Sequence, residues 1–257
     1  MKKVEQKIEE LDAMKSYPKE IFYSGNMELL KRVKVSIVGS RKTSKYTREW
    51  TQKLSSSLAK AGVCVVSGGA MGVDAVAHLG AGSSNTIAVL PCGVDVKYPA
   101  VNKNLLSDIE KNGLLLSQFA PAFRATSWSF VVRNELVVAL GDVLVVAEAE
   151  LGSGSMRSVE FALKMKKEIF VFPHHLGDSG ATQELLKENK AKAIYDVEAF
   201  VSRFGKLQES QKPKDDFLEF CKNSPTYEEA LSKFPSRVFE AELLGAIEVR
   251  NAKVFLV

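Results

Sequence analysis

The sequence predicts an α/β protein: an extended Rossmann-like sheet, parallel or mixed, with helices on both faces, followed by a small C-terminal winged-helix domain. Short β-branched runs alternate with amphipathic stretches between residues 33 and 194, which is the pattern of βα units. The apolar runs are nearly continuous, as expected of strands covered on both faces. After a polar, proline-containing segment, the periodicity changes to short helical stretches and a hairpin.

The predicted elements follow in chain order. Strands are expected at VKVSIVG (33–39), VCVVSG (63–68), TIAVLPCG (86–93), GLLLSQF (113–119), DVLVVAEAEL (142–151), EIFVFPH (168–174) and KAIYD (192–196). Trp50, Leu54 and Leu58 recur at a spacing of four before Gly62, which predicts a helix that lies on the sheet. Helices are expected in DDFLEFCKN (215–223), TYEEALSK (226–233) and the segment from residue 236, which ends in a hairpin with RNAK (250–253) as its turn.

These elements divide the chain into four segments. We expect an N-terminal extension (1–30), a Rossmann-like domain (31–204), a linker (205–214) and a winged-helix-like domain (215–257).

Composition excludes several classes of protein. The scattered cysteines (Cys64, Cys92, Cys221) and histidines (His78, His174, His175) show no ligand spacing, so we expect neither a metal site nor a disulfide framework. The first residues, MKKVEQKIEELDAMKSYP, lack the apolar core of a signal peptide, and no run approaches the ~18 apolar residues of a membrane span. We therefore expect a cytoplasmic protein. Its net charge of +4 is too weak to identify a partner.

The loop after the first strand of the Rossmann-like domain is a candidate anion site. It reads Gly39-Ser40-Arg41-Lys42. Glycine lets a phosphate approach the backbone, and the arginine offers a planar fork of donors. An ordinary βα turn with exposed basic side chains is the alternative.

The loop after the next strand nearly spells a dinucleotide-binding fingerprint. Ser67, Gly68, Gly69 and Gly72 precede Asp74, with serine in the place of the first glycine. That departure disfavours a dinucleotide cofactor, and a tight packing turn is an equal alternative. Asp74 is expected to cap or orient the loop. One helical turn later, His78 is more simply a hydrogen-bonded structural histidine than a base.

A third loop, Ser153-Gly154-Ser155, opens a predicted helix and could cradle a phosphate, with Glu148 at the strand end nearby. A flexible helix cap is the alternative. The sequence contains no G-x-x-x-x-G-K-[ST] motif, so ATP hydrolysis of the P-loop type is not indicated.

The distribution of charge favours a polymer over a free nucleotide. Residues 31–53 contain eight basic residues and one acid, Glu49. FRATSWSFVVRNE (123–135) interleaves rings with guanidinium groups, a composition on which bases of a single strand can stack, although the rings could equally belong to the core. The residues concerned are Phe123, Arg124, Trp128, Phe130 and Arg133, with Asn134 at a presumed helix start. The terminal module, by contrast, carries six basic and eight acidic residues over 213–257, which favours a protein contact over a phosphate contact.

Read together, several motifs resemble the DNA-processing protein A family (DprA, also called Smf) over roughly residues 17–200. The motifs are YPKEIFYSGNMELL, SIVGSRKTSKY, VVSGGAMGVDAVAH, TIAVLPCGVDVKYPAVNKNLL, GLLLSQF, SFVVRNELVVAL and VVAEAELGSGSMRSVEFAL. The resemblance implies a homodimer that binds single-stranded DNA in a basic pocket and hands incoming DNA to the recombinase RecA during natural transformation.

Family binding residues carry over where the motifs are intact. They fall on Gly39, Ser40, Arg41, Ser67, Gly68, Gly69, Gly72, Asp74, Phe130, Arg133, Asn134, Ser153, Gly154 and Ser155; we add Lys42 and Arg124 as candidate contacts. The chain departs from the family at three places. Glu135 replaces an arginine of many members, and Gln118 replaces a glutamate. Ser127 and Trp128 stand where some members have a lysine, for which Arg124 is the candidate substitute.

These observations favour a non-enzymatic single-stranded DNA-binding recombination mediator without a cofactor or metal. One alternative is a nucleotide-processing hydrolase of the LOG type, for which Glu148 near the third loop is the motive. Another is a regulator that binds double-stranded DNA through the winged helix, which the acidity of that module disfavours.

Overall fold

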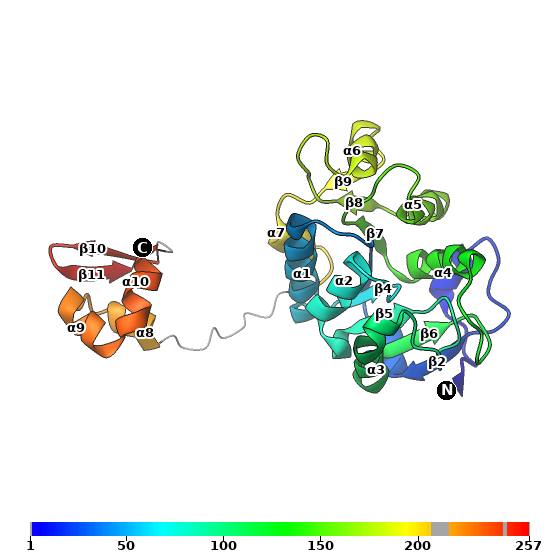
Figure 1. Cartoon of the computed structure of the whole chain (residues 1–257), viewed down its shortest axis with the longest axis horizontal. Helices are drawn as coiled ribbons and strands as arrows, with labels where there is room; N and C mark the ends of the chain where they lie inside the picture. The colour runs from blue at the N-terminus through cyan, green and yellow to red at the C-terminus, as the bar shows by residue number, and fades with distance from the viewer. Residues whose placement is uncertain (1, 207–215, 244–245, 257) are drawn as a thin grey trace. The chain divides into compact units, whose positions relative to one another are not determined.

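The computed structural model describes residues 2–206, 216–243 and 246–256. They form two compact units, Met1–Gln208 and Glu209–Val257 (Figure 1). Residues 207–214 of the predicted linker lie outside the described residues.

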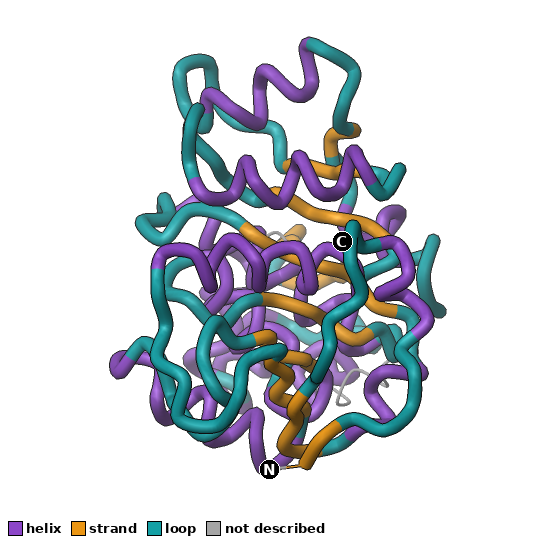
Figure 2. The backbone as a smooth tube through the Cα atoms, turned by 90° about the vertical axis from the view of Figure 1, so that its right-hand side faces the viewer, coloured by secondary structure: helices purple, strands orange, loops and turns teal. Residues whose placement is uncertain are grey.

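The first unit is built on one sheet (Figure 2). Its strands are β1 (Lys2–Lys3), β2 (Phe22–Gly25), β3 (Lys34–Val38), β4 (Cys64–Ser67), β5 (Thr86–Val89), β6 (Leu114–Ser117), β7 (Val143–Val146), β8 (Ile169–Val171) and β9 (Lys192–Ala193). Among the described residues the sheet has nine strands in the order β1-β2-β6-β5-β4-β3-β7-β8-β9. The strands from β6 to β9 in this order pair in parallel, whereas β1 and β2 are antiparallel additions. Every strand predicted from an apolar run is present, and the predicted mixed α/β sheet is confirmed.

Helices cover both faces of this sheet. Their bounds are α1 (Lys45–Lys60), α2 (Val73–Ala81), α3 (Lys103–Asn112), α4 (Ser127–Leu140), α5 (Gly154–Lys164), α6 (Gly180–Lys187) and α7 (Val197–Val201), with short 3₁₀ segments η1 (Glu9–Ala13), η2 (Met27–Lys31), η3 (Ser83–Asn85) and η4 (Ala100–Asn102). Leu54, Leu58 and Phe200 pack α1 and α7 onto one face. Leu136 and Val159 pack α4 and α5 onto the other. Alternate residues of the central strands β3, β4 and β7 enter cores on opposite faces of the sheet, which is why these strands are buried on both sides.

The N-terminal segment contributes two strands to the sheet and several residues to its core. β2 pairs antiparallel with β6, and Ile8, Leu11 and Leu29 are buried in the same core as α4. The boundary that the sequence suggested after residue 30 therefore falls inside a continuous sheet and core.

The second unit contains α8 (Asp216–Cys221), α9 (Tyr227–Lys233), α10 (Pro235–Leu243) and an antiparallel hairpin of β10 (Ile247–Arg250) and β11 (Lys253–Leu256). Phe217, Cys221 and Val254 are in its small core. The hairpin turns at Asn251 and Ala252, both with positive φ, as a two-residue turn between twisted strands requires. The predicted order of three helices and a hairpin is observed, and the winged-helix assignment stays a prediction.

The winding of the first unit fixes where a ligand can bind. From β3 the chain proceeds outward through β4, β5 and β6, and then returns to β7 on the other side of β3. In open α/β sheets such a reversal leaves a crevice at the carboxyl ends of the central strands. None of the helices in the described residues is long and apolar enough to cross a membrane.

Candidate functional site

A cavity of about 660 Å³ lies at the carboxyl ends of β3, β4 and β7. Helices α4 and α5 close its sides. Its lining residues are Val38, Gly39, Ser40, Arg41, Lys42, Gly68, Ala70, Asp74, Ser127, Phe130, Val131, Arg133, Asn134, Val137, Glu150, Ser153, Gly154, Ser155, Arg157 and Ser158.

The Gly39–Lys42 loop is held by backbone hydrogen bonds on both sides. The Ser40 N–H donates to the carbonyl of Glu148 at 2.9 Å, and the Val73 N–H donates to the carbonyl of Ser40 at 3.0 Å. The loop therefore has a fixed shape, and it places the Arg41 guanidinium 4.9 Å from the centre of the Phe130 ring. A cation over a ring face at this distance is an attractive contact.

Two glycines of the second loop make room for this arrangement. Gly72 has φ +74°, and a side chain there would overlap the carbonyls of Ser40 and Arg41. A side chain at Gly68 would occupy the space of the Arg133 guanidinium. Both glycines therefore bring neighbouring groups close to the backbone.

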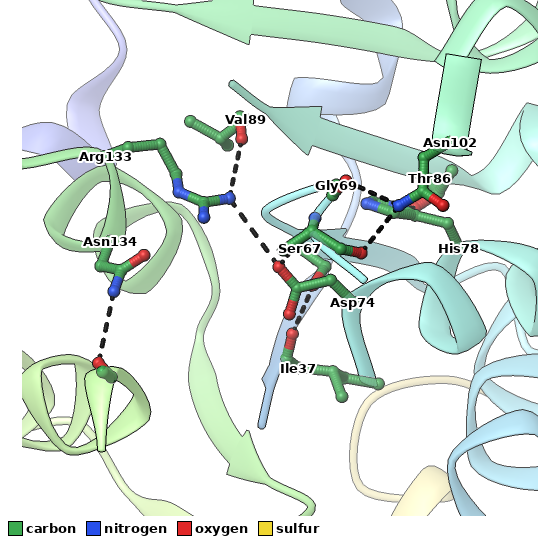
Figure 3. Close-up of polar contacts among 12 residues, drawn as sticks. Ile37, Ser67, Gly69, Asp74, His78, Thr86, Val89, Asn102, Arg133 and Asn134 are labelled. Carbon is green, nitrogen blue, oxygen red and sulfur yellow. Dashed lines mark hydrogen bonds and ion pairs between the residues drawn. The ribbon is translucent and has the colours of Figure 1, made fainter. Parts of the chain in front are cut away.

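Arg133 connects the end of β5 with the Asp74 loop: its guanidinium lies between the carbonyl of Val89 and the carboxylate of Asp74 (Figure 3). It is only 4% exposed, donates from Nη1 to the carbonyl of Val89 at 3.0 Å, and lies 3.8 Å from the Asp74 carboxylate. Asp74 in turn accepts from the Ala70 N–H at 3.2 Å, so it orients the loop as predicted. Burial raises the pKa of the Asp74 carboxyl, although Arg133 acts against that change, and burial lowers the pKa of Arg133.

Among the residues that the structure describes, several buried donors at this cavity have no hydrogen-bond partner. Arg133 Nε, Ser153 Oγ and Ser158 Oγ are buried atoms without a hydrogen bond. Ser153 is the N-cap of α5, and its hydroxyl makes no capping bond. Leaving a buried donor unpaired costs on the order of 1–3 kcal/mol. These donors and the N-terminus of α5 form a site suited to an anion with several oxygens.

Glu148 has a different role from the one that motivated the hydrolase alternative. Its carboxylate accepts from the Ser44 hydroxyl at 2.7 Å and the Ser44 N–H at 3.0 Å, at the start of α1. Burial would raise the pKa of Glu148, but hydrogen bonds from Thr47 and Ser44 outweigh it and lower the pKa. Glu148 is thus engaged at a helix cap and is not part of the cavity lining.

The structure gathers most of the predicted site residues. Twelve line the cavity: Gly39, Ser40, Arg41, Lys42, Gly68, Asp74, Phe130, Arg133, Asn134, Ser153, Gly154 and Ser155. Four do not: Ser67, Gly69, Gly72 and Arg124. Ser67 is buried and donates to the carbonyl of Ile37 at 2.7 Å, Gly69 and Gly72 shape the loop, and Arg124 is exposed on the segment before α4.

Sequence reasoning placed Asn134 at a helix start, and this was wrong. Helix α4 begins at Ser127 behind a capping box of Thr126 and Ser129, so Asn134 is one of its middle residues. It reaches the carbonyl of Gly154 on α5, at 3.5 Å. Sequence reasoning also missed eight lining residues: Val38, Ala70, Ser127, Val131, Val137, Glu150, Arg157 and Ser158.

The predicted concentration of positive charge over residues 31–53 is divided in space. Lys31, Arg32 and Lys34 stand at the amino end of β3, where Lys34 is buried and pairs with Glu10 at 2.6 Å. β3 has five residues, so about 16 Å of strand at ~3.3 Å per residue separates this group from Arg41 and Lys42. The cavity thus has fewer cations than the count along the sequence suggested.

The positions of the cysteines and of the other potential metal-ligating residues in the fold bear on metal binding. The thiols of Cys64, Cys92 and Cys221 are free and buried. Across residues 2–206, 216–243 and 246–256 no group of three or more His, Cys, Asp or Glu is arranged to hold a metal ion.

Comparison with known proteins identifies the family. The family model for DNA recombination-mediator protein A matches residues 5–205. DNA processing protein DprA from Streptococcus pneumoniae is 36% identical over 177 residues, covering 64% of this chain and 62% of its own length. Protein Smf from Borreliella burgdorferi is 32% identical over 208 residues, covering 79% of this chain and 66% of its own. The chain thus spans somewhat less than two thirds of the length of these relatives.

Solved structures agree with this match. DNA processing protein A from Helicobacter pylori, described for its unique single-stranded DNA binding mode, has a TM-score of 0.77 and 38% identity, covering 79% of this chain and 94% of its own. The X-ray structure of DprA from Streptococcus pneumoniae has a TM-score of 0.70 and 33% identity, covering 77% of this chain and 70% of its own. Sequence, sheet and loops therefore agree that the chain belongs to the DNA recombination-mediator protein A family.

Proposed function

We propose that this protein binds single-stranded DNA in the cavity at the carboxyl ends of β3, β4 and β7, and that it acts there as a recombination mediator without converting the DNA chemically. The proposed contacts are the twelve sequence-predicted residues that line the cavity, with Ser158 added. The observation that carries this proposal is a set of buried donors without a hydrogen-bond partner among the described residues: Arg133 Nε on α4, Ser153 Oγ at the N-cap of α5 and Ser158 Oγ within α5.

A phosphodiester group fits these donors. Each phosphate has several acceptor oxygens, so one group can pair donors from α4 and α5 together. Arg41 adds a further cation to the cavity lining, and Phe130 adds a ring that contacts its guanidinium. Bases stack on rings and on guanidinium planes whatever their identity, so this composition supports binding that is largely independent of sequence.

The relatives support the same assignment. The Helicobacter pylori protein, which shares 38% identity and most of the fold, is described as binding single-stranded DNA. Glu148, which motivated the alternative of a nucleotide hydrolase, accepts two hydrogen bonds from Ser44 at the start of α1 and does not line the cavity, which favours the non-catalytic proposal. Incubation with nucleoside monophosphates should therefore release no free base, and chromatographic detection of a base would contradict a non-catalytic role.

The binding proposal is tested by a salt series. Affinity for oligo-dT should fall steeply with salt, with a slope of ~0.7 in log–log units for each phosphate contact on a single strand. Arg41→Ala should weaken binding and flatten the slope by about that one contact. Fluorescence anisotropy with single- and double-stranded DNA of equal length measures both effects.

Lys31→Ala is the matched control. It removes the same charge from the same stretch of sequence, but Lys31 lies beyond the amino end of β3 and pairs with Glu28 at 2.8 Å. The control should leave the slope unchanged. Equal slopes for the two variants would mean that Arg41 does not contact phosphate.

The family resemblance extends the proposal to partners. We propose that the protein forms a homodimer, delivers the bound strand to RecA during natural transformation and works in the cytoplasm. Sedimentation of the purified chain tests the dimer. RecA loading predicts that RecA hydrolyses ATP sooner on strands first coated with a single-stranded DNA-binding protein when this protein is added. An unchanged lag would contradict loading.

A further inference from the structure

Trp128 is a large aromatic side chain that the fold leaves in solvent beside the cavity. Its exposed fraction is 62%. It follows Ser127, a lining residue, and it precedes Val131, another lining residue that is 40% exposed, by three positions on α4. Residues three apart on a helix are surface neighbours. The indole and Val131 therefore extend the cavity wall outward as one apolar surface.

The indole is also held in place. Its ring centre lies 5.7 Å from that of Phe119 in an edge-on arrangement. Phe119 is 6% exposed and stacks on Phe123 at 4.7 Å with an interplanar angle of 11°. The capping box of Thr126 and Ser129 fixes the helical turn that carries the indole. A ring that is positioned before binding loses little conformational freedom when a ligand stacks on it.

The ring inside the cavity is already engaged. Phe130 has the Arg41 guanidinium over it at 4.9 Å, and the ring of Tyr98 meets it at 5.9 Å. Tyr98 is itself 45% exposed. A base that stacks on Phe130 must displace one of these neighbours or stack on the guanidinium, whereas Trp128 has most of its surface free.

From this arrangement we propose that Trp128 is a separate nucleobase-stacking subsite, used by a base of the strand where it leaves the cavity along the N-terminal end of α4. This inference rests on the proposed binding of single-stranded DNA. The occupant is a base of the same strand because the apolar surface is continuous with the cavity and because a strand whose phosphates are held inside must continue past the rim.

The chain offers a direct probe. It has two tryptophans, Trp50 and Trp128, and Trp50 lies on α1 against Tyr46, away from the cavity lining. Trp50→Phe therefore makes Trp128 the sole indole. Oligo-dT should quench its fluorescence on binding, whereas an oligonucleotide of equal length and charge with abasic sites throughout should bind with little quenching.

Affinity measurements on variants of Trp128 separate the contribution of stacking from that of charge. In the Trp50→Phe background, Trp128→Ala should weaken oligo-dT binding on the order of tenfold, the effect of one lost stack. Trp128→Phe should lose less, since a smaller ring remains. The salt slope should be unchanged in both, and neither should alter affinity for the abasic strand. Circular dichroism of each variant confirms that the fold is intact.

The possible failures are distinguishable. If the parent chain does not bind oligo-dT by anisotropy, the proposed function and this subsite fall together. If it binds while Trp128 emission and the Trp128→Ala affinity stay unchanged, only the subsite is wrong. If Trp128→Ala leaves affinity unchanged but lowers the sedimentation coefficient, the ring is a contact between copies of the chain, and the subsite is again wrong.

Discussion

At the scale of single residues, Arg133 does two things at once. Its Nη1 joins α4 to the end of β5 through Val89 and lies near Asp74, while its Nε has no hydrogen-bond partner among the described residues. A charge that is 96% removed from solvent is tolerable only beside a compensating group. The residue that we expect to contact DNA is therefore also one that holds the loop of Asp74 in place.

This dual role predicts a coupled effect on stability. Arg133→Met fills a similar volume but leaves the Asp74 carboxylate buried without its cation, at a cost of ~3–5 kcal/mol in the free energy of unfolding. Adding Asp74→Asn removes that charge, so the double variant should be more stable than Arg133→Met alone. Urea unfolding followed by tryptophan fluorescence measures the stability of Arg133→Met, of Asp74→Asn and of the double variant. If the losses of the two single variants simply add up in the double variant, the two residues do not interact.

His78 is a buried residue whose tautomer and charge follow from its neighbours. The Thr86 hydroxyl donates to the carbonyl of Val65 at 2.8 Å, so it accepts from His78 Nδ1–H at 2.7 Å. Nε2 is buried and has no partner, which fits a neutral ring. Burial, assisted by repulsion from Arg133, lowers the pKa of His78 to about 3. It is the structural histidine that the sequence suggested.

The lowered pKa of His78 makes the free energy of unfolding depend on pH. Between pH 6.5 and about 3, the unfolded chain holds a proton on His78 that the folded chain does not, so the free energy of unfolding falls as the pH falls through this window. At pH 5.5, one unit below the ordinary value, the loss from this group is about 1.4 kcal/mol. His78→Gln removes the titration, and its stability should fall less than that of the parent between pH 7.5 and 5.5. Equal losses would mean that His78 is protonated in the folded state.

At the scale of elements, the central strands could be predicted because their sequences are rich in valine, isoleucine and leucine. β3 reads KVSIV and β7 reads VLVV, and both are buried along their whole length. The loops that follow them could be predicted as well, since glycine beside serine and arginine marks close approach to the backbone. Sequence spacing alone thus located the edge of the sheet at which the site lies.

The elements that could not be predicted lack such a signal. β1 and β2 are short, partly exposed and antiparallel, so neither carries a continuous apolar run. The five residues that end α4, Leu136–Leu140, are all buried, which hides the helical period, and the start of the helix was misplaced as a result. Ser127, Val131 and Asn134 lie on one face of α4 and line the cavity. This face can be recognised in the sequence only when the first residue of the helix is placed correctly. A count of charges along the sequence also does not show at which end of a strand each charge lies. Lys34 and Arg41 fall in the same basic stretch but lie at opposite ends of β3.

At the scale of the whole molecule, the described residues form two units with separate cores. Every residue that lines the cavity belongs to the first unit. The second contributes a net charge of −2 over residues 213–257, from six basic and eight acidic residues. Negative charge opposes contact with a phosphate backbone. DNA binding and the role of the second unit should therefore be separable.

A chain ending at residue 212 tests this separation. It should unfold at the same urea concentration as the full chain when tryptophan fluorescence is followed, because Trp50 and Trp128 both lie in the first unit. Its affinity for oligo-dT should stay within about threefold, ~0.6 kcal/mol, since no lining residue is removed. Loss of binding with an unchanged unfolding midpoint would mean that residues 213–257 contact the strand. If the cavity alone holds the DNA, Arg41→Ala should weaken binding in the shortened chain as much as it does in the full chain. If residues 213–257 hold the DNA instead, Arg41→Ala should have no effect in the shortened chain.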